Sequence, residues 1–392
     1  MPRSTRPQST RPTSTGLTSA ARPSASLGDI AVVLGTRPEI IKLASVVRAL
    51  GPRARVIHTG QHWDDSMAGQ FFAGLGIGEP DVQLTAMSGK GRPEQIAEGI
   101  AELTAHFRAH RPATVIVQGD TNSTSVGAQA ASYLDIPVVH VEAGLRSYDR
   151  AMPEELNRLV VCALAELHCA ATIDNRDNLL REGVPAERIA LTGNTVVEAT
   201  IDSLAAAVPA ARAESGRPVV LATIHRPENT DDPAALRRAL DGLRRIDADV
   251  ILSLHPRTEA AATRWGLAGL LDAFDVRRGL GHGDFLALAS AADLLVSDSG
   301  GVQEEVTVLK KPLLVVRRST ERPESVDAGF ARLVVPGEDI AAVAAEVLAE
   351  PGLAARLAAT PSPYGDGRAG ELIAQATIRI AERSASVLPH AA

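Results

Sequence analysis

The chain is poor in cysteine. Only Cys162 and Cys169 occur among its 392 residues, and no second Cys or His pair stands at a metal-ligand spacing. This excludes a disulfide framework and argues against a cysteine metal cluster, so we expect no metal site. Both residues lie in an apolar stretch, where we interpret them as small hydrophobic side chains on a helix or strand. Such cysteine usage fits a reducing cytosol, so we expect a cytoplasmic protein.

Long apolar runs and excess positive charge are also missing. No run approaches the roughly 18 apolar residues of a membrane-spanning helix, so we expect no membrane association. The formal net charge is −7, which argues against nucleic acid or any other general polyanion as a partner. Any phosphate affinity must then come from a local site.

Two nucleotide-binding signatures are absent. The chain has neither the G-x-G-x-x-G fingerprint of dinucleotide enzymes nor a Walker A loop, so nicotinamide chemistry and P-loop phosphoryl transfer lack their usual supports. The glycine-rich run over residues 74–78 is interpreted as a turn. We therefore expect no cofactor.

The N-terminal segment has no acidic residue and almost no large apolar one. It is rich in Ser, Thr, Pro and Ala and holds four arginines before residue 27, a composition that cannot bury enough surface to fold. We predict a disordered tail over residues 1–27 and a second tail over 386–392. An organellar transit peptide is the alternative for the first segment.

From Asp29 onward, short apolar runs alternate with helical periodicity, which is typical of βαβ units and parallel sheets. We predict an α/β protein of two Rossmann-like, doubly wound domains that face each other across a cleft. The predicted boundaries are 28–205 for the N-terminal domain with the catalytic acids and 206–365 for the C-terminal domain. An Ala-rich and then charged linker over 204–217 separates them.

The predicted strands and helices follow this alternation. In the first domain, strands are expected over 30–34, 54–58, 114–118, 137–141 and 169–173, and helices over 38–50 and 123–134. In the second, strands are expected over 219–224, 250–254, 294–297 and 313–316, with helices over 233–244 and from residue 301. A final helix is expected over 370–383, after a Pro/Gly-rich crossover at 361–367.

Ligands of doubly wound sheets bind beyond the carboxyl ends of the strands. Polar and charged residues follow predicted strands at five places, namely residues 35–38, 119–121, 140–146, 225–228 and 298–301. Since two domains contribute these segments, we expect the binding site in the cleft between them.

Ser299, Gly300 and Gly301 follow a predicted strand and open a helix. Glycine lets a ligand approach the backbone, and a helix N-terminus offers free N–H groups and partial positive charge, which suits a diphosphate. An ordinary turn with Ser299 as N-cap is the alternative. The acids Glu304 and Glu305 lie one turn further, where a carboxylate accepts ribose hydroxyls or merely stabilises the helix start.

Three acids lie at the functional edge of the first predicted sheet. Asp120 and Glu142 each end a strand, and Glu154 follows Pro153 at a predicted helix start. Partial burial there can tune a carboxyl group for proton transfer. Helix capping or ion pairs with Arg146, Arg150 or Arg158 are the alternatives for each acid taken alone. In the second domain His225 ends a strand beside Arg226, where it can contact phosphate or transfer a proton. His255, Arg257 and Arg322 add further polar groups on that side.

These segments together resemble the non-hydrolysing UDP-N-acetylglucosamine 2-epimerase family. The matching motifs, in family order, are GTRPEIIK from Gly35, TGQH from Thr59, GDT from Gly119, VEAGLR from Val141, PEELNR from Pro153, TGNTV from Thr192, HRPEN from His225, DSGGVQEE from Asp298, TERPE from Thr320 and PYGDG from Pro363. The resemblance covers residues 30–383, and ten motifs in order are highly specific.

The resemblance implies a GT-B-like pair of domains, with a C-terminal helix over 366–385 that crosses back to the N-terminal domain. It implies a UDP-sugar substrate bound mainly by the C-terminal domain, and a homodimer. By matched position it assigns catalysis to Asp120, Glu142, Glu154 and His225. It assigns substrate or UDP binding to Arg37, Lys42, Arg146, His255, Phe285, Ser299, Gly300, Gly301, Glu305 and Arg322.

The implied reaction suits these residue types. C2 of the sugar has no adjacent carbonyl, so its proton is not acidic enough for simple removal and return. The family eliminates UDP to form 2-acetamidoglucal and then adds it back with the opposite configuration at C2. This needs a carboxylate base, an acid for the other face and cationic or N–H stabilisation of the departing diphosphate. It also needs a cleft that closes against water.

One position departs from the family pattern. Asp64 stands where allosterically activated bacterial members carry a second glutamine, three residues after the one that matches Gln61. We therefore expect weak activation by substrate or none.

Other functions remain open on sequence alone. Within the same class they are a C2 epimerase for a modified UDP-sugar of the diacetamido-uronic acid type and a hydrolysing 2-epimerase. A GT-B glycosyltransferase shares the architecture but needs an acceptor site, and a catalytically silent nucleotide-sugar sensor is the fourth alternative. The set Asp120, Glu142 and Glu154 favours the epimerase.

Overall fold

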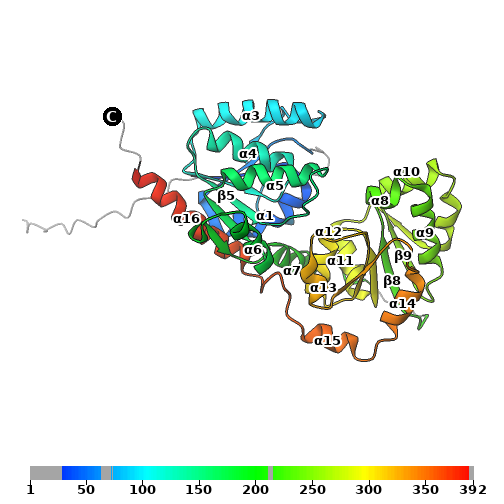
Figure 1. The fold of residues 1–392 in the computed structure, drawn as a ribbon. Helices are drawn as coiled ribbons and strands as arrows, with labels where there is room; N and C mark the ends of the chain where they lie inside the picture. The colour runs from blue at the N-terminus through cyan, green and yellow to red at the C-terminus, as the bar shows by residue number, and fades with distance from the viewer. Residues whose placement is uncertain (1–28, 63–71, 73, 211–214, 388–392) are drawn as a thin grey trace, which may run out of the picture.

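A computed structural model describes residues 29–62, 72, 74–210 and 215–387. It places two parallel sheets side by side, each sandwiched between helices (Figure 1). We call the parts built on them the first lobe and the second lobe. The first predicted tail and Asp64 lie outside the described residues, as do residues 388–392 of the second tail, so those predictions stay open. The final helix extends to Val387, so the prediction of a tail was wrong for residues 386 and 387.

Within the described residues the first sheet has seven strands in the order β3-β2-β1-β4-β5-β6-β7. Its strands are β1 Ile30–Leu34, β2 Ala54–His58, β3 Val82–Gln83, β4 Thr114–Gln118, β5 Val138–Ala143, β6 Leu167–Ala170 and β7 Ile189–Leu191. The second described sheet has six strands in the order β10-β9-β8-β11-β12-β13. They are β8 Val219–Thr223, β9 Asp249–Leu254, β10 Asp275–Arg278, β11 Leu294–Ser297, β12 Leu313–Val316 and β13 Ala331–Val334.

Helices connect the strands in both lobes. Those of the first are α1 Arg37–Leu50, α3 Arg92–Ala109, α4 Asn122–Ser132, α5 Pro153–Leu164, α6 Ile173–Arg181 and α7 Val196–Ala206. The second contains α8 Pro227–Thr230, α9 Pro233–Arg244, α10 Pro256–Arg264, α11 His282–Ala291, α12 Gly300–Leu309, α13 Pro323–Asp327, α14 Ile340–Leu348 and α15 Leu353–Ala359. The short 3₁₀ turns are η1 Gly51–Arg53, η2 Ala186–Arg188 and η3 Ala268–Ala273, and the chain ends in α16 Ala369–Val387.

Strand residues alternate between two apolar cores in each lobe. Ile30, Val32 and Leu34 of β1 pack in one core, whereas Ala31 and Val33 pack in the core on the opposite face. The same alternation divides β8 between two cores. Because both faces are covered by helices, the strands are continuous apolar runs, as expected of parallel sheets.

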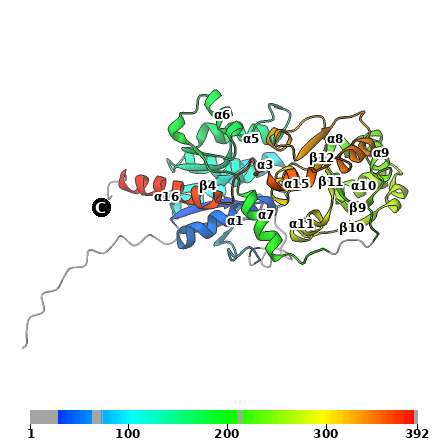
Figure 2. The same ribbon diagram turned by 90° about the horizontal axis from the view of Figure 1, so that it is seen from below.

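Helices α7 and α16 join the two lobes. Figure 2 shows α7 beside α1 of the first lobe and α11 of the second, and it packs on both. After α15 of the second lobe the chain returns, and α16 packs along α1 with Ile373 and Ile380 in the same core as β1 (Figure 1). The cleft walls are therefore held by chain segments that are far apart in sequence.

The start of α16 depends on a close contact at Gly370. Its backbone N–H donates to Oε1 of Glu198 on α7 at 2.6 Å, and a Cβ built there would lie 2.6–2.8 Å from Ser45, including its backbone carbon. We expect Gly370→Ala to lower the free energy of unfolding by about 1–3 kcal/mol, since the helix must shift away from α1. Urea unfolding measures this. The control is Arg379→Ala on the exposed face of α16, and an unchanged midpoint for Gly370→Ala would contradict the prediction.

Most predicted elements agree with the structure to within two residues, but one strand was wrong. We predicted a strand over 169–173, whereas β6 ends at Ala170 and α6 begins at Ile173. The side chain of Thr172 accepts a hydrogen bond from the backbone N–H of Asn175 and so caps the helix, which favours the helix start over the β-branched residues' strand preference. Strands β3, β7, β10 and β13 were not predicted.

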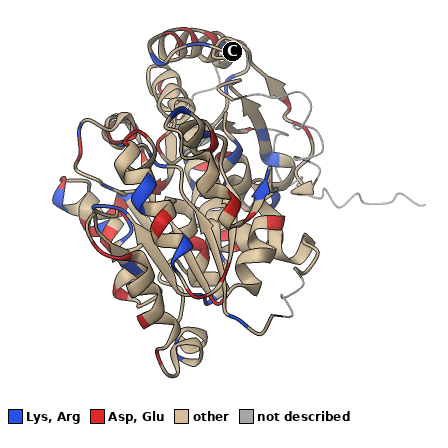
Figure 3. Ribbon diagram, turned by 90° about the vertical axis from the view of Figure 1, so that its right-hand side faces the viewer, with Lys and Arg blue, Asp and Glu red and all other residues tan. Residues whose placement is uncertain are grey.

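Both cysteines are free, with Cys169 buried on β6 and Cys162 half-buried on α5, in agreement with their predicted structural role. The described residues contain no group of three or more His, Cys, Asp or Glu arranged to hold a metal ion. In the same residues, no helix has the length and apolar character of a membrane span. Acidic and basic residues alternate around the second lobe without a large region of one sign (Figure 3).

Candidate active site

The predicted ligand-binding segments line a cleft between the two lobes. Its first part is a cavity of about 560 Å³ whose lining includes Arg37, Lys42, Asp120, Glu142, Phe285, Ser299, Gly301, Glu305 and Arg322. Its second part, about 1320 Å³, is lined by Arg146, Glu154, His225 and His255, among others. Arg322 borders the first part and its neighbour Glu321 the second, so the two parts adjoin. The structure thus gathers the predicted residues in one cleft but divides the four predicted catalytic residues between its two parts.

Glu142 occupies a strained position at the end of β5. The pairing of β5 with β6 shifts register between Val141 and Ala143, and Glu142 has a positive φ of 60°. A bulge of this kind re-aims a side chain, and a non-glycine residue in the left-handed region stores strain of about 1–3 kcal/mol that clusters at functional sites. The carboxylate accepts hydrogen bonds from Lys42 Nζ at 2.8 Å and from Gln118 Nε2.

A charge cluster connects the lobes around Glu142. Lys42 also bonds Glu304 of the second lobe at 3.3 Å, and Arg322 donates through Nε to Glu304 at 2.8 Å. Nη2 of Arg322 lies 3.9 Å from Glu142. Burial alone would lower the pKa of Lys42, but Glu142 and Glu304 outweigh it and the pKa is raised. Burial would also lower the pKa of Arg322, but the same carboxylates raise it. Lys42 and Arg322 therefore both stay charged inside the cleft.

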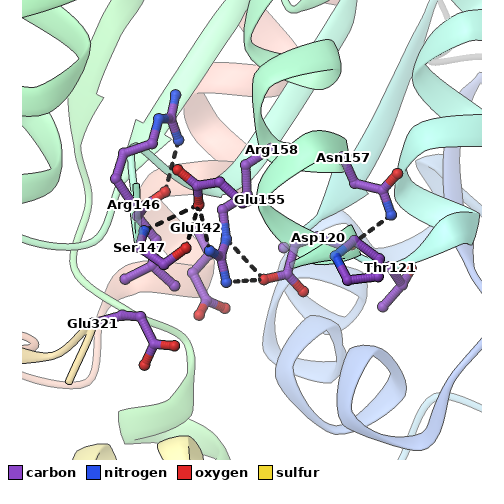
Figure 4. Close-up of polar contacts among 12 residues, drawn as sticks. Asp120, Thr121, Glu142, Arg146, Ser147, Glu155, Asn157, Arg158 and Glu321 are labelled. Carbon is purple, nitrogen blue, oxygen red and sulfur yellow. Dashed lines mark hydrogen bonds and ion pairs between the residues drawn. The ribbon is translucent and has the colours of Figure 1, made fainter. Parts of the chain in front are cut away.

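Asp120 forms an ion pair with Arg158, one of the pairings that the sequence analysis gave as an alternative to catalysis. Nε of Arg158 donates to Oδ2 of Asp120 at 2.9 Å, and Nη1 of the same residue bonds Glu155 at 2.7 Å (Figure 4). Burial would raise the pKa of Glu155, but the Ser147 backbone N–H and Arg158 more than offset it and the pKa is lowered. Asp120 retains partial exposure at the cleft, so the pairing positions it without removing it from a ligand.

Arg146 does not form the ion pair with a predicted catalytic acid that was weighed as an alternative, and Glu154 is exposed. The buried guanidinium of Arg146 pairs with Glu182 through two bonds of 2.7 Å, so its pairing with any of the three predicted acids was wrong. Glu154 is exposed in the first turn of α5, where it lines the larger cavity. That leaves its carboxylate open to a ligand in that part of the cleft.

His225 lies just after β8 and is anchored through Asp298. The fully buried Asp298 accepts hydrogen bonds from the backbone N–H groups of His225 and Arg226, at 2.9 and 2.8 Å, and its Oδ1 lies 3.6 Å from Nδ1 of His225. The His225 and His255 rings are 4.9 Å apart. Burial, His255 and two arginines outweigh Asp298 and lower the pKa of His225, which favours a neutral imidazole near pH 7.

The N-terminus of α12 faces the same cleft. Ser299 is the N-cap residue, as the alternative predicted, but its side chain accepts no capping bond. The first-turn N–H groups therefore remain for a ligand. A Cβ at Gly300 would lie 2.6 Å from Nη1 of Arg322 and 3.4 Å from Nη2 of Arg226. Two guanidinium groups therefore lie over this helix end, an arrangement that suits an anionic ligand.

Glu305 and Phe285 lie together on the second-lobe wall. Nε2 of His282 bonds Oε1 of Glu305 at 2.9 Å, and Nδ1 of the same ring lies 3.1 Å from Ser203 Oγ on α7. Phe285 is one turn further along α11 and borders the same cavity. This wall offers a carboxylate and an aromatic ring beside the anion-binding helix end.

Sequence reasoning assigned no role to several residues that build the site. They are Glu39, Gln118, Arg226 and Asp298. Each lies inside or beside a recognised motif, but at least one of its partners lies far away in sequence. Only Arg226 carried a usable signal, since its charge directly follows the predicted strand end.

Known proteins share this sequence and structure. Residues 48–378 match the sequence model of the UDP-N-acetylglucosamine 2-epimerase family. The UDP-N-acetylglucosamine 2-epimerase of Methanocaldococcus jannaschii is 37% identical over 361 residues, covering 88% of this chain and 97% of that protein. The UDP-2,3-diacetamido-2,3-dideoxy-D-glucuronate 2-epimerase of Pseudomonas aeruginosa is 34% identical over 88% of this chain and 98% of its own.

A solved structure agrees as well. The crystal structure of the Methanocaldococcus jannaschii UDP-GlcNAc 2-epimerase in complex with UDP-GlcNAc and UDP has a TM-score of 0.78 at 35% identity. It covers 89% of this chain and 99% of that chain. The GT-B-like fold predicted from the resemblance is thereby confirmed, and the chain belongs to the UDP-N-acetylglucosamine 2-epimerase family.

Proposed function

We propose that this chain interconverts UDP-GlcNAc and UDP-ManNAc by inverting C2 without net hydrolysis. The observation that carries the proposal is the composition of the two cleft walls. One wall is an anion-binding helix end with Arg226 and Arg322 over Gly300, and the other presents Asp120 and Glu142. Leaving-group stabilisation and proton transfer are the two requirements of an elimination.

In the proposed elimination, a carboxylate removes the proton from C2 while the bond between C1 and the diphosphate oxygen breaks. The C2–H electron pair forms the C1–C2 double bond, and UDP leaves with the C1–O electrons, stabilised by the α12 N–H groups and by Lys42 and Arg322. The products of this step are 2-acetamidoglucal and UDP. In the return step a proton reaches C2 from the opposite face, and a β-phosphate oxygen of UDP bonds C1 again. No external oxidant or cofactor takes part.

We assign the proton-transfer groups to Asp120, Glu142, Glu154 and His225. Asp120 and Glu142 border the cavity that also holds the phosphate-binding wall, whereas Glu154 and His225 border the larger part. Acids on different sides of one substrate suit a reaction that handles both faces of C2. For UDP we assign Phe285 to the uracil side, Glu305 to the ribose hydroxyls and Ser299, Gly300 and Gly301 to the phosphates. The homodimer stays a prediction.

A modified UDP-sugar is the second candidate substrate. It is favoured by the Pseudomonas aeruginosa relative, whose name gives a diacetamido-glucuronate substrate and whose identity to this chain is close to that of the UDP-GlcNAc enzymes. The larger cavity contains arginine side chains, among them Arg181 and Arg318, that suit a uronate carboxylate. The same elimination and return would apply to that sugar.

Proton NMR of the protein with UDP-GlcNAc in deuterated buffer tests the proposal. We expect UDP-ManNAc to appear with deuterium at C2, because the abstracted proton exchanges with solvent before it returns. Free ManNAc with stoichiometric UDP would instead identify a hydrolysing epimerase. An unchanged spectrum from protein that binds UDP would reject UDP-GlcNAc as substrate, and the diacetamido-uronate sugar is then the next compound to test.

A further inference from the structure

Glu39 is a buried acid that the proposed chemistry does not use. It lies in the first turn of α1, and only 1% of the residue is exposed. An acid at this position ordinarily stabilises the helix N-terminus from the surface. Complete burial of a carboxyl group is costly unless specific partners compensate for it, so its contacts explain its presence.

Four donors converge on the Glu39 carboxylate from two loops. Oε2 accepts from the backbone N–H of Gly35 at 3.0 Å and from Thr36 Oγ1 at 2.8 Å. Oε1 accepts from Thr121 Oγ1 at 2.8 Å and from Thr124 Oγ1 at 3.2 Å. The first pair belongs to the loop after β1 and the second to the loop and helix start after β4, and these two strands are neighbours in the sheet. One carboxylate therefore ties together two adjoining loops.

Each tied loop carries a residue of the proposed site. Arg37 directly follows Thr36, and Asp120 directly precedes Thr121. The opposite side of Asp120 is fixed by Arg158, and its backbone carbonyl accepts from Nδ2 of Asn157 at 2.9 Å. Glu39 adds a contact to that loop through Thr121, besides the hydrogen bond between His140 Nε2 and the Gly119 carbonyl at 2.8 Å.

An ionised carboxylate can accept from all of these groups, with the single proton of Thr124 Oγ1 shared between Glu39 at 3.2 Å and the Gln118 carbonyl at 2.6 Å. Glutamine has one acceptor oxygen and replaces the other with an NH₂ donor, which would face two hydroxyl groups. Burial raises the pKa of Glu39 to about 7, against the four hydrogen bonds that lower it. The polar groups that contact Glu39 from the β4–α4 side are the hydroxyls of Thr121 and Thr124. Glu39 also borders the smaller cavity, whose other charged or titratable lining groups are Arg37, Lys42, Asp120, Glu142, His282, Glu305 and Arg322.

We propose that Glu39 is a positioning residue for the proposed epimerisation, whose ionised carboxylate holds the loops of Arg37 and Asp120 in register and whose protonation releases them. The expected effect on catalysis rests on the proposed function, whereas the expected loosening of the two loops does not. It also gives the reaction a pH dependence through a cavity-lining carboxyl group that is not assigned to proton transfer. The two consequences are tested separately.

The structural test is hydrogen exchange of the full-length, substrate-free protein. We expect the protection of the amides at 35–37 and 119–121 to be lower in Glu39→Gln than in the parent at pH 8. In the parent it should also fall between pH 8 and pH 6, after correction for intrinsic exchange. The control is Glu94→Gln, which alters the exposed acid of the same Arg-Pro-Glu sequence at the start of α3. Unchanged protection in both comparisons would overturn the proposal, and the parent alone suffices if the variant does not fold.

The kinetic test compares kcat/KM of parent and Glu39→Gln on UDP-GlcNAc from pH 6 to pH 8. We expect the parent to exceed the variant by about ten- to a hundredfold at pH 8, because small displacements of reacting groups cost that much. The ratio should approach one at pH 6, where the parent is itself protonated. A constant ratio would overturn the positioning role. If the loops loosen as expected but the parent does not convert UDP-GlcNAc, the proposed function fails and the positioning role stands.

Discussion

Replacing Glu142 with glutamine is expected to lower kcat about a hundred- to ten-thousandfold, the usual contribution of a general acid or base. The substitution keeps the side chain's size and one acceptor oxygen but removes its ability to take or give a proton. The surrounding cluster should persist, because Lys42 and Arg322 both keep Glu304 as partner, at 3.3 and 2.8 Å. The loss should therefore appear in kcat and not in folding.

Two measurements separate chemistry from binding in this variant. Conversion of UDP-GlcNAc followed by NMR gives kcat, and calorimetric titration gives the affinity for UDP, which we expect to change less than tenfold. Glu166→Gln is the matched control, since Glu166 is an exposed acid of the same lobe that lies 3.6 Å from Arg188. A kcat within about threefold of the parent would reduce Glu142 to an ion-pair partner of Lys42.

The sequence predicted the sheet architecture and the place of the cleft well, because both follow from local patterns. Apolar runs such as residues 114–118 are buried on both faces of a parallel sheet, and the polar residues after them necessarily gather at one sheet edge. That pattern placed Asp120 and Glu142 at the sheet edge, and the family resemblance then assigned them to catalysis. The sequence did not predict that Asp120 and Glu142 border one part of the cleft and Glu154 and His225 the other, because this depends on how the lobes pack together.

The remaining errors concern contacts between distant segments. Arg146 was weighed as a partner of the catalytic acids, yet it binds Glu182, which lies 36 residues further along the chain. Glu304 was considered as a ribose contact or a helix-start acid, whereas its carboxylate accepts a hydrogen bond from Lys42 of the other lobe. Residue type and spacing carry no information about such pairs, because the partner is chosen by the tertiary arrangement of helices and loops.

The arginine side chains that crowd the start of α12 leave no room for a side chain at Gly300, the proposed phosphate-binding residue. Arg322 is held by Glu304 through Nε, with Nη1 close to the start of α12 and Nη2 3.9 Å from Glu142. Arg226 approaches the same helix end, and burial together with the neighbouring Arg317 lowers its pKa. A diphosphate placed there would relieve the repulsion between these guanidinium groups, so ligand affinity depends on their close approach to Gly300.

Gly300→Ala is accordingly expected to weaken UDP binding about ten- to a hundredfold, which corresponds to about 1.4–2.7 kcal/mol. The added Cβ would lie 2.6 Å from Nη1 of Arg322, and this arginine cannot move away without separating from the buried carboxylate of Glu304. Calorimetric titration with UDP measures the loss, and the melting temperature shows whether the fold is kept. Gly269→Ala, at a second-lobe site with nothing within 4 Å of the new Cβ, should bind UDP as the parent does. If Gly300→Ala retains parental affinity, the guanidinium groups do not bind the diphosphate at this helix end, and the phosphate assignment of Gly300 is wrong.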